Sequence, residues 1–179
     1  MIMMVISALT FGQPLTGTKV IPGDYPTVQS AILFLNANGV GPGGVTFLVS
    51  GGHTETFSSH TAGLITATGT VADPVTFQWN GNSTRPVITG CPNPGSKYDY
   101  IIGLQGSDYV TFNGFDLVSS DTVQEWGFAF LKGSPTNGSH GNKLLNCSIT
   151  LNKANTLTIG VYGGNLNPSN PTQSVDVAD

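Results

Sequence analysis

The sequence predicts an all-β fold, a parallel β-helix in which short strands stack in successive coils. The first observation is a repeated tripeptide. Val-Thr-Phe occurs at residues 45–47, 75–77 and 110–112. Each copy alternates apolar and polar residues, as a strand with one buried face does, and is bounded by residues that favour turns. A strand that recurs every 30 to 35 residues is typical of stacked coils rather than of one compact sandwich.

Composition is the second observation. Of the 179 residues 9% are charged, against about 25% in an average globular protein, while Gly (24) and Pro (11) are abundant. Such a chain favours turns and strands over exposed helices, which usually carry Glu and Lys. The net charge is -4 and the six Lys and Arg residues are scattered, so we expect no nucleic-acid partner and no polybasic membrane contact. No apolar segment is long enough to predict a membrane span.

Residues 1–12 are interpreted as the remnant of a signal peptide. An apolar run from residue 2 to residue 9 precedes Gly12, after which cleavage fits the small-residue pattern of such sites. The alternative is a buried first strand, because the basic residues that usually begin a signal peptide are missing. The first interpretation predicts that the protein is secreted or lies at the cell surface.

Residues 13–40 are predicted to form an N-terminal segment and one capping helix. Asp24 is expected to cap this helix, with Pro26 in its first turn and Gly39 in the left-handed conformation that ends it. The apolar side chains that share one face are Val28, Ala31, Ile32 and Leu35. The remainder, residues 41–179, is predicted to consist of parallel β-helix coils.

Two columns of short apolar strands support the stacking of these coils. The first column consists of residues 101–104, 127–130 and 159–162. Its steps of 26 and 32 residues predict that Ile102, Phe128 and Ile159 lie near one another in successive coils. The second column consists of residues 110–117 and 143–149, and residues 174–177 are expected to begin its third member.

Within the second column, residues 114–117 align with residues 146–149. Phe115 then becomes equivalent to Cys147, and Leu117 to Ile149. This alignment makes the apolar strand, rather than the tripeptide Val-Thr-Phe, the repeating unit. Since the tripeptide recurs at unequal intervals, of 30 and 35 residues, we expect Val45 and Val75 to lie on different sides of a coil.

Several segments resemble secreted right-handed parallel β-helix proteins of Bacteroidetes, which share the architecture of the pectin-lyase superfamily and are of the kind exported by type IX secretion. The resemblance covers residues 17–165. It rests on the order and spacing of residues 24–27, 35–40, 44–47, 75–79, 86–90, 101–117 and 146–149.

By this resemblance the helix would cap the first coil and cover its open edge. The other end has no counterpart, because residues 175–179 stop inside a strand-like segment without a closing helix or coil. We therefore expect a fragment truncated at its C-terminus rather than a complete protein. The sorting domain with which members of this family often end is not visible in the sequence.

The resemblance also sets the chemistry to look for. Polysaccharide lyases on this fold use acidic residues for Ca²⁺ with a Lys or Arg base, and glycoside hydrolases use closely placed carboxylates. The densest acidic group is Asp116, Asp121 and Glu125, which a polar turn explains without catalysis. Lys97 and Asp99 are interpreted as a solvated loop pair. We predict no catalytic residue.

Histidines give little support for a metal site. His53 and Glu55 alternate on one strand face and could hold a metal, but two ligands do not make a site. His53, His60 and His140 are expected to be polar surface residues. We predict neither a metal site nor a cofactor, and no binding residue is assigned.

Four aromatic residues would stack on sugar rings if they were exposed in line on one face: Trp79, Trp126, Tyr98 and Tyr162. Trp79 continues a buried alternation and is expected in the core, whereas Trp126 follows a polar loop and is expected at the surface.

Asparagine and cysteine residues are expected to have structural roles. Asn113 and Asn146 are predicted to stack on each other or to bond the backbone at coil corners. Cys91 and Cys147 are interpreted as unpaired, with a disulfide bridge as the alternative.

These observations favour the non-catalytic N-terminal β-helix part of an exported surface protein, which serves in adhesion or carbohydrate contact. Its expected partners are a polysaccharide or cell-surface glycan and the remainder of its own longer chain. The alternative is a fragment of a polysaccharide lyase or glycoside hydrolase whose catalytic coils lie beyond residue 179.

Overall fold

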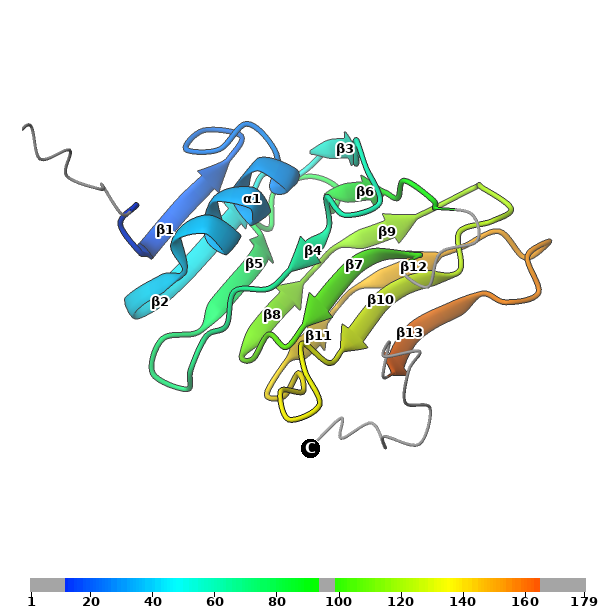
Figure 1. Ribbon diagram of the computed structural model, residues 1–179. Coiled ribbons are helices and arrows are strands. Elements are labelled where there is room, and N and C mark those ends of the chain that lie inside the picture. Colours follow the sequence, from blue (N-terminus) through cyan, green and yellow to red (C-terminus); the bar gives the residue numbers. More distant parts are fainter. Residues whose placement is uncertain (1–11, 94–98, 165–179) are drawn as a thin grey trace, which may run out of the picture.

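The computed structural model describes residues 12–93 and 99–164, which form a parallel β-helix. From β2 onward each coil adds one strand to each of three sheets, and every pair of neighbouring strands is parallel (Figure 1). The predicted fold class is therefore confirmed. Within the described residues no hairpin joins 101–104 to 110–117, since these two segments belong to different sheets.

Sheet A contains five strands whose spatial order follows the chain. They are β1 (Leu15–Ile21), β2 (Val40–Val49), β5 (Val75–Trp79), β8 (Val110–Asn113) and β11 (Lys143–Leu145). The sequence patterns do not single out β1, because Ile21 alone of its seven residues is fully buried.

Sheets B and C contain four strands each. The strands of sheet B are β3 (Thr54–Thr56), β6 (Val87–Thr89), β9 (Asp116–Val118) and β12 (Ser148–Thr150). The strands of sheet C are β4 (Leu64–Ile65), β7 (Tyr100–Gln105), β10 (Trp126–Leu131) and β13 (Ile159–Gly164). In each of these coils the chain passes from sheet A to sheet B to sheet C.

The three Val-Thr-Phe tripeptides pair in register with one another in sheet A. Val45 pairs with Val75, and Val75 pairs with Val110. The rings of Phe47, Phe77 and Phe112 consequently stack inside the coil, with centroids 4.6 and 4.8 Å apart. The expectation that Val45 and Val75 lie on different sides of a coil is wrong. Unequal spacing did not change the register, because connecting loops absorb the extra residues at little cost.

The sheet C column is confirmed in part. Ile102 pairs with Phe128 as predicted, but Phe128 pairs with Val161, while Ile159 pairs with Trp126. Ile159 is therefore two residues from its predicted place beside Phe128, and the step between these strands is 33 residues rather than 32. The cause is the connection before β13, residues 151–158, which is one residue longer than the equivalent connection 119–125.

The second predicted column is confirmed where the structure describes it. Ser148 pairs with Asp116 and Ile149 with Leu117, and the Ser148 amide donates to the Phe115 carbonyl. This register makes Cys147 equivalent to Phe115. Residues 174–177, the expected third member, lie outside the described residues.

Helix α1 (Val28–Asn38) buries the predicted apolar face and ends at Gly39, which has φ 70°. Its N-cap is Thr27, so the prediction of Asp24 is wrong. Thr27 and Ser30 each accept a hydrogen bond from the other's amide, which satisfies two free N–H groups at the helix start. Asp24 instead accepts a hydrogen bond from the Val20 amide, and this contact belongs to the preceding turn.

In chain order, α1 takes the place between β1 and β2 that strands of sheets B and C hold in later coils (Figure 1). Asn36 fastens the helix to β4 with both ends of its amide. Its nitrogen donates to the Leu64 carbonyl at 2.7 Å, and its oxygen accepts from the amides of Thr66 and Ala67. The helix thus covers backbone groups at the edge of sheet C, as the resemblance implied.

Candidate functional site

The acidic residues Asp116, Asp121 and Glu125 do not form one site. The Asp116 carboxylate pairs with the Arg85 guanidinium at 3.2 Å on the outer face of sheet B. Asp121 accepts a hydrogen bond from the Val123 amide within its own turn. Within the described residues, no three His, Cys, Asp or Glu side chains gather in a way that could hold a metal ion.

Asp99 is buried, with 2% of its surface exposed, so the expectation of a solvated loop pair is wrong for this residue. Its Oδ1 accepts hydrogen bonds from the Gln124 side-chain amide at 2.8 Å and from the Asn93 backbone amide at 3.2 Å. Burial raises the pKa of the Asp99 carboxyl above its ordinary value, and the nearby charges of Glu125 and Asp121 act in the same direction. Lys97 lies outside the described residues.

Glu55 binds the N-terminus of α1 rather than a metal. Its carboxylate oxygens accept hydrogen bonds from the amides of Val28 at 2.7 Å and Gln29 at 2.9 Å. An anion at this position complements the positive end of the helix dipole. The His53 ring also contacts Glu55, at 3.1 Å. Sequence spacing could not reveal this link, because the helix lies 26 and 27 residues before Glu55.

The two tryptophans differ from what their positions predicted. Trp126 is buried and its ring stacks on that of Tyr162, with centroids 3.9 Å apart and planes 6° apart. The expectation of an exposed Trp126 is therefore wrong. Trp79 is half-buried at the end of β5, where its indole N–H donates to the Asn82 carbonyl. Tyr98 lies outside the described residues.

The predicted structural roles of asparagine and cysteine are confirmed. The side-chain amide of Asn146 donates to the side-chain oxygen of Asn113 at 2.9 Å, and this bond joins the corners of two successive coils. Cys91 and Cys147 are both unpaired and half-buried. Of the remaining histidines, His140 is exposed and contacts Asp108 at 3.0 Å, and His60 is half-buried in a loop.

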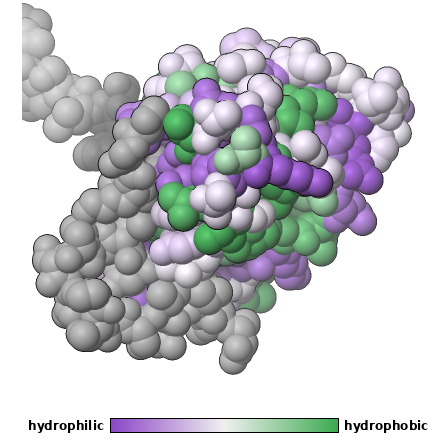
Figure 2. Space-filling model, turned by 90° about the vertical axis from the view of Figure 1, so that its right-hand side faces the viewer, coloured by the Kyte–Doolittle hydropathy of each residue, from purple (hydrophilic) through white to green (hydrophobic). Residues whose placement is uncertain are grey.

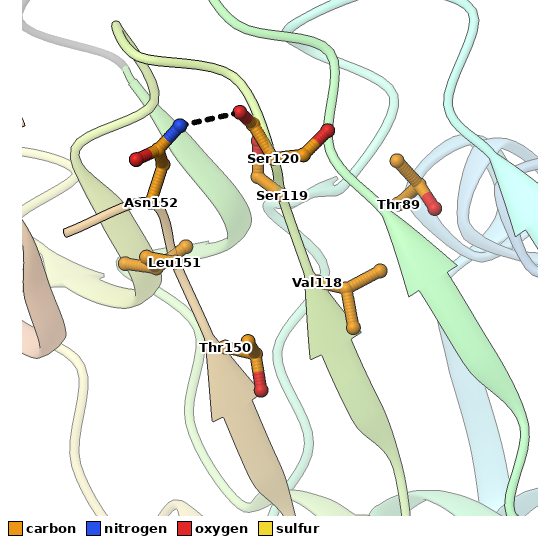
Figure 3. Close-up of a pocket in the computed structure, with 7 residues that line it drawn as sticks. All are labelled: Thr89, Val118, Ser119, Ser120, Thr150, Leu151 and Asn152. Carbon is orange, nitrogen blue, oxygen red and sulfur yellow. Dashed lines mark hydrogen bonds between the residues drawn. The ribbon is translucent and has the colours of Figure 1, made fainter. Parts of the chain in front are cut away.

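The candidate site is an open groove of about 450 Å³ at the ends of β6, β9 and β12, which we call the sheet B groove (Figure 3). Its lining residues come from three successive coils. They are Thr89, Val118, Ser119, Ser120, Thr150, Leu151 and Asn152. None of these seven side chains is charged.

Strand register places the groove residues side by side. Thr89 pairs with Val118 and Val118 with Thr150, so one row crosses three coils on the outer face of sheet B. Next to this row the Asn152 side chain donates to the Ser120 carbonyl at 2.7 Å, the contact drawn in Figure 3. Asn152 thereby links the last two coils at the edge of the groove.

Three hydroxyl groups of the groove are available to a ligand. Among the described residues, no hydrogen bond involves the hydroxyls of Thr89, Ser120 or Thr150, whereas the Ser119 hydroxyl accepts from the Asp121 amide. Val118 and Leu151 supply half-buried apolar surface between them. The arrangement can form hydrogen bonds and apolar contacts with a neutral ligand.

Sequence reasoning missed this groove. The 32-residue offset that aligns Leu117 with Ile149 also places Val118 beside Thr150, so two of the three residues in the row could have been found. Thr89 could not, because β6 follows a loop of different length and belongs to neither column.

No family model, curated protein or solved structure matches this chain. The resemblance to β-helix proteins of Bacteroidetes therefore stays a prediction. No helix in residues 12–93 and 99–164 has the length and apolar character needed to span a membrane.

Proposed function

We propose that this chain is a non-catalytic β-helix of a secreted or cell-surface protein and contacts carbohydrate through the sheet B groove. The observation that carries the proposal is the presence of one hydroxyl from each of three successive coils, on Thr89, Ser120 and Thr150, for which the described residues offer no hydrogen-bond partner. A hydroxyl both donates and accepts hydrogen bonds, and therefore suits the hydroxyl groups of a sugar. We further propose, from the sequence segments named above, a relationship to the pectin-lyase-like proteins exported by type IX secretion.

The contacts of the acidic residues support a role without catalysis. Glu55 holds the start of α1, Asp116 pairs with Arg85, and Asp99 is bound by Gln124. Each of these carboxylates therefore already has a bonding partner within the fold. A pair of carboxylates on either side of a sugar, as glycoside hydrolysis needs, would have to leave these partners.

The proposal is tested by applying the purified 179-residue chain to a glycan array and incubating it with the glycans that bind. We expect retention on carbohydrate without release of shorter or unsaturated sugars. Release of such products would overturn the non-catalytic assignment and favour the lyase or hydrolase alternative. Retention of no glycan would remove carbohydrate contact from the proposal.

A further inference from the structure

We propose that the sheet B groove binds an uncharged polysaccharide chain that runs across the coils, parallel to the solenoid axis. This inference rests on the proposed carbohydrate contact and specifies its ligand class and direction. It follows from the hydroxyls that three successive coils supply, from the charges around the groove and from its apolar surface.

Each of three successive coils supplies the groove with one hydroxyl that is available to a ligand. Thr89, Val118 and Thr150 occupy equivalent positions in β6, β9 and β12, and neighbouring parallel strands lie about 4.8 Å apart. In the middle coil Val118 has no hydroxyl, and Ser120, two residues further along the chain, supplies it. Polar groups that repeat from coil to coil match a ligand that is itself a repeating chain. Because the groove is open to solvent, such a chain can extend beyond the three coils that form it.

Charge selects a neutral ligand over an acidic one. A carboxylate or sulfate brought against this surface would lose hydration and would need a cation in return. Arg85, at the other end of the sheet B strands, is already paired with Asp116. At the rim, the exposed Lys153 follows Asn152 and the exposed Asp121 follows Ser120, so the rim carries one charge of each sign.

Apolar surface completes the match to a sugar chain. Val118 lies at the centre of the row, and Leu151 lies beside Thr150 at the end of β12 (Figure 3). Sugar rings present C–H groups on their faces and hydroxyls at their edges. Val118 and the part of Leu151 that is not packed against the core can contact the C–H groups, while Thr89, Ser120 and Thr150 bond the hydroxyls.

The test is isothermal titration calorimetry on the full chain with cello-, xylo- and manno-oligosaccharides, and with oligogalacturonate as the acidic probe. We expect one or more of the uncharged probes to bind at least about tenfold more tightly than oligogalacturonate, because no free cation lines the groove. Val118→Lys places an ammonium at the centre of the groove and should weaken this binding by about tenfold or more. The matched control, Thr54→Lys, adds the same charge to an exposed position of sheet B outside the groove and should leave the affinity within about twofold.

Thr150→Val is the second variant, because it removes one hydroxyl from an exposed position while keeping its shape. It should weaken binding by about threefold to tenfold. Unchanged affinity in both Val118→Lys and Thr150→Val would overturn the location of the site. Tighter binding of oligogalacturonate would overturn the ligand class but leave carbohydrate contact intact, whereas binding of none of the probes would remove both.

Discussion

The two ends of the described solenoid bury equivalent residues to different extents. Near the α1 end Phe47 of β2 is completely buried, and in the coil of β8, β9 and β10 Phe112 and Phe128 are almost completely buried. In the coil of β11, β12 and β13, the residues paired with them are Leu144, which is half-buried, and Val161, which is 48% exposed. Figure 2 views the molecule from this end, where hydrophobic residues lie among polar ones.

This difference shows that the sequence of a strand in a solenoid does not by itself determine how far its side chains are buried. β8 and β11 occupy the same position in sheet A, but β8 has β5 on one side and β11 on the other. Among the described residues, β11 has a neighbour on one side. Burial therefore depends on the coils above and below, as expected when each repeat contacts its neighbours alone.

The largest expected effect comes from truncating the phenylalanine stack at its centre. Phe77 is fully buried between Phe47 and Phe112, so Phe77→Ala should lower the free energy of unfolding by about 3–5 kcal/mol. Leu144→Ala is the matched change in the same row of the last described coil, and it should cost about 1 kcal/mol because Leu144 is half-buried. Urea unfolding followed by circular dichroism measures both changes. Equal losses at the two positions would contradict the dependence of burial on neighbouring coils.

A smaller effect is expected from the asparagines that fasten the two ends. Asn36→Ala leaves the Leu64 carbonyl and the Thr66 and Ala67 amides without their partner, at a cost of about 1–3 kcal/mol. Asn152→Ala removes an exposed bond to the Ser120 carbonyl, which water can replace, and should cost less than about 1 kcal/mol.

Hydrogen exchange separates this local effect from a global one. In Asn36→Ala the amides of Thr66 and Ala67 should exchange faster, while the Phe77 amide in sheet A should follow the global change in stability. If Asn152→Ala proved as costly as Asn36→Ala, the two ends would be equally dependent on their asparagine contacts, and the proposed difference between them would fail.

Sequence reasoning predicted the stacked parallel strands because their apolar alternation is local. It failed where register depended on loop length. Val45 and Val75 pair in spite of the unequal spacing of the tripeptides, and the step to the strand that begins at Ile159 is one residue longer than predicted. No propensity decides how many residues a loop absorbs, so register between coils required the structure.

Side-chain environments of the candidate functional residues were harder still to predict. Trp126 opens a strand after a polar loop, yet its ring is buried because Tyr162 of the next coil stacks on it. Glu55 looks like half of a metal site in sequence, but two amides of α1 occupy its carboxylate. In both cases the deciding partner is 26 to 36 residues away. The position of Thr89 in the sheet B groove depends on the same kind of distant pairing.

The smallest expected effect concerns a polar group that the surrounding coils bury. Because burial raises the pKa of Asp99 above its ordinary value of 3.8, the folded protein keeps this proton to a higher pH than the unfolded chain does. The stability that Asp99 contributes is therefore complete below about pH 4 and is lost as pH rises through the folded-state pKa. Asp99→Asn keeps the acceptor oxygen but cannot ionise, so the fall in unfolding free energy on raising the pH should shrink.

Urea unfolding of the wild type and Asp99→Asn across this pH range measures the change. Asp121→Asn is the control, since Asp121 is exposed in the next connection and its removal should leave most of the wild-type pH dependence in place. An identical pH profile in the wild type and Asp99→Asn would show that the Asp99 carboxyl ionises as easily in the coil as in the unfolded chain. Burial by neighbouring coils would then have no electrostatic consequence at this position, and the contrast between central and terminal coils would be limited to apolar packing.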